Sequence, residues 1–531
     1  MSAALRSVSV LAGTAVVLYA VFVIYLVAGP LHSDDLWFHL TLGRHFVAHG
    51  LWSGFDPALH TAHAASPVLH EWLFDVAIHG LETQLGFAGL RVLLAGGVAI
   101  ILGLAWSTLR RESAGPMAAY AAMAVFLSLS WWRLHELRPH LVSIAFTLLF
   151  VRLLVQPESP PSWRRVWIGA VLGGVWANLH PGFILGPVLL LGAAIGCAIR
   201  AALFSRLPGE RAAAGSEARR GWRLGGAAAL TLVATLMNPR GFHQHLTFFE
   251  FRRDTALPAL DEWPGFDPFG FTDVGSSFGG FEWMVAEGLL LLTVSVAAAG
   301  LWRLLRHPSA ESLRAVDPVA LLLAGLSLVA MLVAMRFSWL AVLPLLFLLR
   351  AQREGARGLP WLASPRLAAG LASLAVALAV AFGALARYGQ FAVVNPSSWA
   401  ASSYTAAKYF APGMQFLGET GVEGNVFNSY HAGGFLGYWL SPRLRAFIDG
   451  RNEAYPPEVH RDYERVILRR GAAGDGDLLG LLDRRRVDLF LGDGYPFGLS
   501  QGPRYYTAAH LWEAPGWILV FRSVDHAVYL R

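Results

Sequence analysis

The sequence predicts a polytopic α-helical membrane protein with about eleven transmembrane helices, followed by a C-terminal α/β domain. Two observations predict the membrane class. Of 531 residues, 55% are hydrophobic and 15% are charged, whereas roughly a quarter are charged in a soluble protein. The apolar residues also lie in long blocks rather than in amphipathic stripes. A third observation predicts the last domain, because strand-like and helix-like segments alternate after residue 387.

The apolar blocks define the predicted spans. The first block continues to about Gly29 without a small-residue cleavage site, so we interpret it as a retained helix and not as a signal peptide. Several blocks are shorter than the roughly 20 residues of a straight span, which favours tight hairpins or partly re-entrant pairs around His180 and Arg336. The predicted spans are 7–29, 88–109, 116–132, 140–156, 166–179, 182–199, 224–237, 283–302, 317–335, 337–350 and 367–387.

Arginine placement orients these helices. Arginines such as Arg6, Arg110 and Arg111 gather on one side, mainly in short loops, which is the positive-inside pattern of cytoplasmic loops. This pattern accounts for the net charge of +6 without a nucleic-acid partner. We therefore expect a bacterial cytoplasmic-membrane protein with a cytoplasmic N-terminus. The expected division is a membrane domain, 1–387, with external loops 30–87 and 238–282, and a periplasmic α/β domain, 388–531.

The C-terminal region is predicted to alternate between strands and helices. EGNVFNSYHAGGFLGYWL suggests a strand, a glycine turn and a helix, RAFIDGR a strand, and LLGLLDRRRVDLFLGDG a helix and a strand over 487–491. WILVFRSVDHAVYL suggests a closing hairpin. GNVFNSYHAGG lacks the Gly-Lys-Ser/Thr end of a Walker loop and the GxGxxG pattern, so no nucleotide site is predicted. Asn428, His431, Asp449 and Arg451 lie at strand ends, where ligands can bind, but turn roles are the favoured interpretation.

An acidic pair, Asp34 and Asp35, directly follows the first predicted helix. One carboxylate could act as a general base on an attacking hydroxyl, while the other binds a divalent ion or orients a neighbour. The alternative is that Ser33-Asp34-Asp35 begins a helix, since acids are favoured in a first turn. His39, about one turn later, would share a helix face with Asp35 and could form a metal or acid/base pair with it.

A second polar group in the same loop is His70-Glu71, just before an amphipathic segment. These side chains could complete a metal shell with Asp34 or Asp35. Alternatively, Glu71 is a first-turn acid and Trp72 an interfacial anchor. The sequence thus leaves open whether a divalent cation, Mg²⁺ or Mn²⁺, is required.

Basic residues gather at the predicted outer helix junctions. Arg138 and His140 belong to WWRLHELRPH, which has five ionisable groups, and guanidinium and imidazole groups there could clamp a phosphate. His180 in NLHPG and Arg240 in NPRG are weaker candidates for the same role. The alternative at each position is ordinary contact with lipid headgroups. Cys197 is the only cysteine, which excludes an internal disulfide.

This layout resembles the GT-C superfamily of integral membrane glycosyltransferases, which includes protein O-mannosyltransferases, aminoarabinose transferases and oligosaccharyltransferases. The resemblance covers most of the chain. It implies a polyprenyl-phosphate-linked sugar donor and inverting transfer at the outer membrane face to a lipid, glycan or protein acceptor. The segments that carry it are SDDLWFHLTLGR, HEW, RPHL, NLHPG, NPRG and NSYHAGGFLGYWL…FIDGR.

The resemblance also implies roles for single residues. The catalytic aspartate of the first loop matches Asp34 or Asp35. The cations that hold the donor phosphate match Arg138, His140, His180 or Arg240. Asp34 and Asp35 are contiguous, unlike the spaced acid-x-Asp form of some members, which puts a metal requirement in doubt.

Three other functions are compatible with the sequence. A lipid-linked glycan ligase or polymerase would use related chemistry on the same side of the membrane. A polyprenyl-lipid transporter would carry ionisable residues within its spans and inverted repeats, and neither is clear here. A non-catalytic assembly scaffold would tolerate the loss of Asp34 and Asp35.

Overall fold

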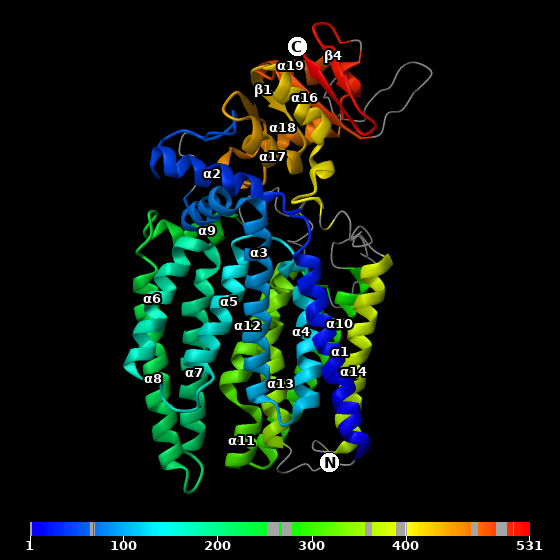
Figure 1. Ribbon diagram of the computed structural model, residues 1–531. Coiled ribbons are helices and arrows are strands. Elements are labelled where there is room, and N and C mark those ends of the chain that lie inside the picture. The colour runs from blue at the N-terminus through cyan, green and yellow to red at the C-terminus, as the bar shows by residue number, and fades with distance from the viewer. Residues whose placement is uncertain are drawn as a thin grey trace. The chain divides into compact units, whose positions relative to one another are not determined.

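The protein divides into two compact units (Figure 1). The helical unit consists of Met1–Gly29, Val92–Leu246 and Leu257–Trp399, and the mixed unit consists of Pro30–Arg91, Thr247–Ala256 and Ala400–Arg531. Residues 252–264 and 268–278 of the expected external loop 238–282 lie outside the described residues. The computed structural model describes residues 3–63, 67, 69–251, 265–267, 279–355, 364–388, 399, 401–468, 476–494, 507–512 and 514–531.

The helical unit is a bundle of long helices that lie side by side (Figure 1). Helix α7 packs on α8 and on α12, and α14 packs on α1 and α4. Its elements are α1 (Ala3–Val27), the second half of α3 (Trp72–Glu112), α4 (Pro116–Leu134), α5 (His140–Phe150), the π-helix η1 (Val151–Val155), α6 (Trp163–Leu179), η2 (Pro181–Ile184), α7 (Leu185–Phe204), α8 (Arg211–Ala234), α10 (Gly279–Arg306), α11 (Ala310–Val316), α12 (Pro318–Val333), η4 (Met335–Ala341), α13 (Val342–Gly355) and α14 (Pro365–Tyr388).

The class of fold is confirmed, whereas the number of spans is not. Each predicted span coincides with helix in the structure. Among the described residues, eight helices are long and apolar enough to cross a membrane. The short α5 with η1, the 17-residue α6, and α8 are not among these eight. In α8 the half from Arg211 to Arg223 carries several charges, which leaves only a short apolar stretch.

The helical unit has two chemically different ends, because consecutive helices run in opposite directions. The arginine-rich end contains the α3–α4, η1–α6 and α7–α8 connections and the end of α13. There the buried guanidinium of Arg350 lies 2.9 Å from Glu112 and 2.6 Å from Asp317. This bridge ties α3, α12 and α13 together and keeps all three charges paired. The opposite end contains the α4–α5, α6–α7 and α12–η4 connections.

The mixed unit is built on a five-stranded sheet with the order β2-β1-β3-β5-β4. Strand β1 pairs in parallel with β2 and β3, and β5 pairs antiparallel with β3 and β4, as the predicted strand–helix alternation and closing hairpin require. The strands are β1 (Gly424–Phe427), β2 (Leu444–Ala446), β3 (Leu489–Asp493), β4 (Ile518–Arg522) and β5 (His526–Leu530). The helices are α2 (Asp35–His49), the first half of α3, η7 (Ala406–Tyr409), α16 (Ala411–Thr420), α17 (Tyr430–Leu440), η8 (Asn452–Ala454), α18 (Pro457–Ile467), α19 (Gly476–Arg484) and η9 (Ala509–Leu511), while α9 (His243–Phe251) falls in both units.

The first loop, expected within a membrane domain, packs with the C-terminal sheet instead. Leu59 pairs with Ala446 of the edge strand β2. The Ala446 amide donates to the Ala58 carbonyl at 2.7 Å, and the His60 amide donates to the Ala446 carbonyl at 3.1 Å. These bonds satisfy backbone groups that an edge strand would otherwise expose. The mixed unit therefore brings together the first loop and the C-terminal region, which are separated by some three hundred residues of sequence.

Helix α3 also differs from expectation, since the amphipathic segment after Trp72 and the span from residue 88 form one continuous 41-residue helix. The backbone breaks at Gly86, where φ is 62° and ψ is −167°. Glycine adopts this conformation without the steric cost of a Cβ atom. The helix is shared by both units, since Arg91 ends a segment of one and Val92 begins a segment of the other.

Candidate functional site

The predicted catalytic pair lies at the beginning of α2 in the mixed unit. Trp37, two residues after Asp35, is fully buried and anchors this end of the helix. Its ring centroid lies 4.7 Å from that of Phe435 and 5.0 Å from that of Tyr404. Edge-to-face packing of this kind fixes the helix against α17. The beginning of α2, which carries the two aspartates, is thus anchored by an aromatic cluster.

Asp34 and Asp35 have different surroundings. Asp34 is the N-cap residue of α2, but its side chain makes no capping hydrogen bond. Its carboxylate lies 2.8 Å from Nζ of Lys408. The Asp35 carboxylate lies against Gly450, because a Cβ atom on Gly450 would collide with Asp35 Oδ1. The structure therefore separates the two carboxylates, one beside a cation and one beside the backbone of the turn after β2.

His39 is buried in α2 and has carboxylates near both ring nitrogens. Its Nδ1 lies 2.6 Å from Oδ1 of Asp75, and its Nε2 lies 3.9 Å from Oε2 of Glu71. An Asp–His pair of this kind fixes the orientation and tautomer of the imidazole. The predicted partner was Asp35, and the contact with Asp75 was not anticipated.

His70 and Glu71 lie beside a carboxylate that the sequence analysis did not single out. His70 Nε2 is 3.7 Å from Oε2 of Glu71 and 3.4 Å from Oε1 of Glu453. Burial raises the pKa of Glu453 to about 7, and the negative charges of Asp449 and Asp35 act in the same direction. A carboxyl group with a pKa near neutrality can take up and release protons under physiological conditions.

The residues available for a metal do not form a ligand shell. Within the described part of the chain, no three His, Cys, Asp or Glu side chains are grouped so that they could hold a metal ion. The described residues therefore do not form a three-ligand protein shell for the divalent ion that the sequence leaves open.

The turn FIDGR is fixed by a buried ionic triad. The Arg451 guanidinium lies 2.8 Å from Asp56 and 2.6 Å from Asp449, and all three side chains are at most 2% exposed. Asn428 supports the same turn, because its amide group donates to the Ile448 carbonyl and accepts from the Phe447 amide. These contacts favour structural roles for Asn428, Asp449 and Arg451, and they position Gly450 and Glu453.

The basic candidates lie at the end of the helical unit opposite its arginine-rich end. His140 is buried, accepts a hydrogen bond at Nδ1 from Arg133 at 3.2 Å, and donates from Nε2 to the Arg133 carbonyl at 2.5 Å. Both of its nitrogens are thus used within the α4–α5 connection. Arg138 lies 3.2 Å from Glu136, which offsets part of its charge.

His180 and Arg240 lie on neighbouring connections of this end. His180 Nδ1 accepts from the Gly182 amide at 3.0 Å and lies 2.7 Å from the Ser143 hydroxyl. Nδ1 is therefore unprotonated, and the ring proton is on Nε2. The NLHPG and NPRG segments are joined because the Asn178 amide group donates to the Met237 carbonyl at 2.8 Å. Arg240 follows in a turn closed by its own amide and Asn238 Oδ1.

The candidate residues thus form two groups. Asp34, Asp35, His39, His70 and Glu71 lie together in the mixed unit, and the structure adds Lys408, Asp75 and Glu453 to them. Arg138, His140, His180 and Arg240 lie at one end of the helical unit. Lys408 is the only lysine of the chain, and Glu453 follows the FIDGR segment by two residues, but neither feature indicates a site without the tertiary contacts.

Comparison with known proteins identifies the fold. No protein-family model and no curated protein sequence matches the chain. The solved archaeal oligosaccharyltransferase AglB from Archaeoglobus fulgidus, in complex with an inhibitory peptide and a dolichol-phosphate, matches with a TM-score of 0.53 and 14% identity, over 91% of this chain and 69% of that one. The Archaeoglobus fulgidus oligosaccharyltransferase tethered to an acceptor peptide gives a TM-score of 0.50, 13% identity and the same coverage.

A third solved structure, ArnT from Cupriavidus metallidurans bound to undecaprenyl phosphate, covers 99% of this chain and 98% of that one at 15% identity, with a TM-score of 0.45. At these identities the likeness to AglB shows a shared fold. The chain therefore shares the fold of AglB, as its resemblance to the GT-C superfamily implies, and it is a multi-pass membrane protein with a C-terminal sheet domain.

Proposed function

We propose that the protein is a glycosyltransferase that moves a sugar from a polyprenyl-phosphate-linked donor to an acceptor at the outer face of the membrane. The observation that carries the proposal is the position of Asp35 on a GT-C fold, at the beginning of the helix that follows the first membrane span. AglB, which shares the fold, was solved with a dolichol-phosphate and a peptide. The acceptor here is a lipid, glycan or protein.

Asp35 is the proposed general base. Asp34 is ion-paired with Lys408, so its carboxylate is already engaged with a cation of the protein. Asp35 lies against the backbone of Gly450, and its negative charge helps to raise the pKa of Glu453. In the proposed reaction Asp35 takes the proton of the acceptor hydroxyl, whose oxygen attacks the anomeric carbon with inversion. The bond from that carbon to the phosphate oxygen breaks, and the lipid phosphate leaves with the electron pair.

Glu453 and His70 form a second acid/base pair within the same unit. Their side chains are 3.4 Å apart, and the pKa of Glu453 is raised to about 7. In the proposal, this pair accepts the proton that Asp35 has removed, or holds the acceptor by hydrogen bonds. His39 of α2 is oriented by Asp75 and lies near Glu71, and in the proposal it holds Glu71 beside the pair.

Cationic side chains of the helical unit are proposed to hold the departing phosphate. The N–H donors come from Arg138, His180 and Arg240, at the end of the helical unit opposite its arginine-rich end. Charge-assisted hydrogen bonds to a phosphate are strong. His140 contributes indirectly, because both of its ring nitrogens hold Arg133. Stabilisation of the leaving phosphate by such fixed donors is a principal source of catalysis in group transfer.

The direct test measures sugar transfer in membranes from a radiolabelled polyprenyl-phosphate sugar pool. We expect Asp35→Asn to lower transfer at least about 100-fold, since a positioned base contributes roughly that much. Asp34→Asn should retain more activity, within about tenfold of the wild type, because Asp34 acts through its pair with Lys408. Asp483→Asn is the matched control, since that carboxylate is 52% exposed and belongs to the same unit.

Each contrary outcome has a defined meaning. If both Asp34→Asn and Asp35→Asn match a robust wild-type signal, the pair is structural and the proposal is wrong. If the wild type transfers no sugar from a broad donor set, a transporter or a scaffold explains the chain better. A product that grows by repeated addition would identify a glycan ligase or polymerase. Membrane insertion and melting temperature are compared for all variants, so that a folding defect is recognised.

A further inference from the structure

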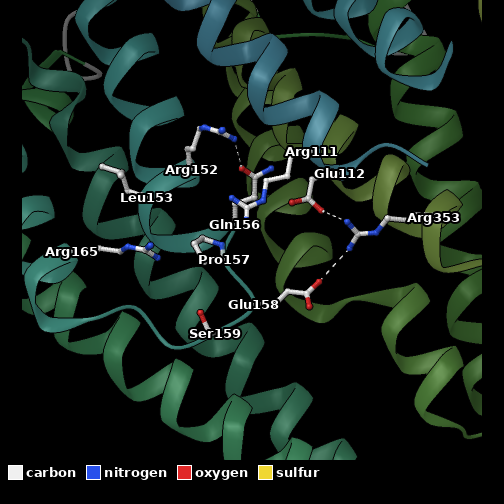
Figure 2. Close-up of a pocket in the computed structure, with 10 residues that line it drawn as sticks. All are labelled: Arg111, Glu112, Arg152, Leu153, Gln156, Pro157, Glu158, Ser159, Arg165 and Arg353. Atoms are coloured by element: carbon white, nitrogen blue, oxygen red, sulfur yellow. Dashed lines mark hydrogen bonds and ion pairs between the residues drawn. The ribbon is translucent and has the colours of Figure 1, made fainter. Parts of the chain in front are cut away.

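The arginine-rich end of the helical unit contains a polar cavity that the proposed transfer reaction does not use. Its volume is about 550 Å³, within the range of small-molecule sites. It lies where α3 ends, η1 passes into the next loop, and α6 begins, with α13 on the far side (Figure 2). The lining residues are Arg111, Glu112, Arg152, Leu153, Gln156, Pro157, Glu158, Ser159, Arg165 and Arg353.

The lining carries more positive than negative charge. Four arginines face two glutamates, and both glutamates are engaged with Arg353 at 3.3 and 3.4 Å. Glu112 is further neutralised by the buried Arg350 at 2.9 Å. In the described part of the chain, no carboxylate lies within ion-pair distance of Arg111, Arg152 or Arg165. The cavity therefore has a net positive charge that its own walls do not balance.

The walls are preorganised by hydrogen bonds. Arg152 belongs to the π-helix η1, and its guanidinium donates to the Ser107 carbonyl at 3.1 Å and to Gln156 Oε1 at 3.4 Å. Gln156 donates in turn to the Thr108 carbonyl at 2.8 Å. These contacts join η1 to α3, and single-turn π-helices are frequent at functional sites. Figure 2 shows Arg165 and Arg353 directed toward the cavity from opposite sides.

We infer that this cavity binds a phosphate-bearing group. Planar guanidinium groups from three separate segments, Arg111, Arg152 and Arg165, suit the several oxygens of one phosphate, which arginine binds bidentately. The mostly polar lining favours a charged headgroup over an apolar ligand. The phosphate belongs either to an anionic phospholipid headgroup or to a free phosphate compound, and the inference does not depend on the proposed transferase activity.

Neighbouring arginines provide a matched control. Arg110 and Arg164 directly precede Arg111 and Arg165 in the sequence but do not line the cavity. The double variants Arg111→Gln/Arg165→Gln and Arg110→Gln/Arg164→Gln remove the same charge from the same end of the bundle. If the arginines act only by general attraction to the membrane surface, both double variants weaken binding equally. If they form a site, only Arg111→Gln/Arg165→Gln weakens binding.

The experiment measures binding by the full-length protein in nanodiscs of phosphatidylcholine. One arm titrates inorganic pyrophosphate, and the other replaces graded fractions of the lipid with phosphatidylglycerol, with bound species counted by native mass spectrometry. We expect Arg111→Gln/Arg165→Gln to weaken binding at least about tenfold in one arm, since hydrogen bonds between charged groups are strong. Arg110→Gln/Arg164→Gln should stay within about twofold of the wild type.

The arm that responds identifies the source of the phosphate. Loss confined to phosphatidylglycerol indicates a lipid headgroup, and loss of pyrophosphate binding indicates a free compound. Equal effects of the two double variants in both arms, or no binding by the wild type in either arm, would overturn the inference. Equal melting temperatures of the two double variants would show that a folding defect does not cause the loss of binding.

Discussion

Lys408, the only lysine in the sequence, lies 2.8 Å from the carboxylate of Asp34 and donates from the same ammonium to the His32 carbonyl at 3.0 Å. The two residues are separated by more than three hundred positions in sequence. Their contact links the beginning of α2 to the segment that precedes α16. It also gives Asp34 and Asp35 different electrostatic surroundings, although they are neighbours in the chain.

The first prediction concerns this pair. The side chains of Lys408 and Asp34 are 37% and 29% exposed, so water screens their attraction. A double-mutant cycle with Lys408→Met and Asp34→Asn should therefore give a coupling free energy of about 0.5–1 kcal/mol in unfolding. Lys408→Arg, which preserves the charge, should stay close to the wild type. Fully additive single effects would show that the pair contributes nothing.

The second prediction concerns the buried triad Asp56–Arg451–Asp449. Arg451→Met leaves two buried carboxylates without their cation, and it should lower the free energy of unfolding by about 3–5 kcal/mol. Arg531→Ala is the control, since Arg531 is 44% exposed in its pair with Asp483, and its loss should cost less than about 0.5 kcal/mol. Thermal unfolding of the solubilised protein measures both. A small effect of Arg451→Met would mean that the turn is held by other contacts.

The third prediction is a dependence of stability on pH. The pKa of Glu453 rises from its ordinary value of 4.5 to about 7 on folding, mainly because the group is buried. The folded state therefore binds the proton more tightly, and this contribution is complete below pH 4.5 and is lost as the pH rises through about 7. Glu453→Gln should remove that loss.

The measurement is the melting temperature of wild type and Glu453→Gln from about pH 4.5, the ordinary pKa of Glu453, to about pH 8, above its raised pKa. We expect the melting temperature of Glu453→Gln to change by a few degrees less than that of the wild type over this range, because the variant has no proton to release at this position. His70, Asp449, Asp35 and Arg451 also face Glu453 and remain in both proteins. Parallel curves for the two proteins would contradict the prediction.

The fourth prediction concerns Gly450. A Cβ atom there would collide with Asp35 Oδ1 and come within 3.0 Å of the Phe38 ring, so Gly450→Ala should displace the Asp35 carboxylate. Because a small misplacement of a catalytic group is costly, sugar transfer should fall by about tenfold or more. Gly480→Ala should leave transfer unchanged, since the nearest atom that a Cβ there would meet is at the flexible end of Arg484, 3.5 Å away. Equal activity of the two variants would exclude this role for Asp35.

The sequence by itself determined the membrane class, the positions of the helices and the strand–helix alternation of the C-terminal region. These features depend on local composition and periodicity, which neighbouring residues specify. The same local information correctly indicated the strands near Val426, Leu489 and Val528. It could not settle how many helices cross the membrane, because α6 and α8 are helical without being clearly long or apolar enough.

Only the tertiary structure decided which residues meet. The pairing of Asp34 with Lys408, of His39 with Asp75 and of His70 with Glu453 joins side chains from separate segments. No periodicity encodes such contacts. They arise when the first loop pairs its backbone with the edge strand β2 and Asp56 of that loop binds Arg451. The partly buried position that raises the pKa of Glu453 is likewise a property of the packed unit and not of the segment FIDGRNEAY.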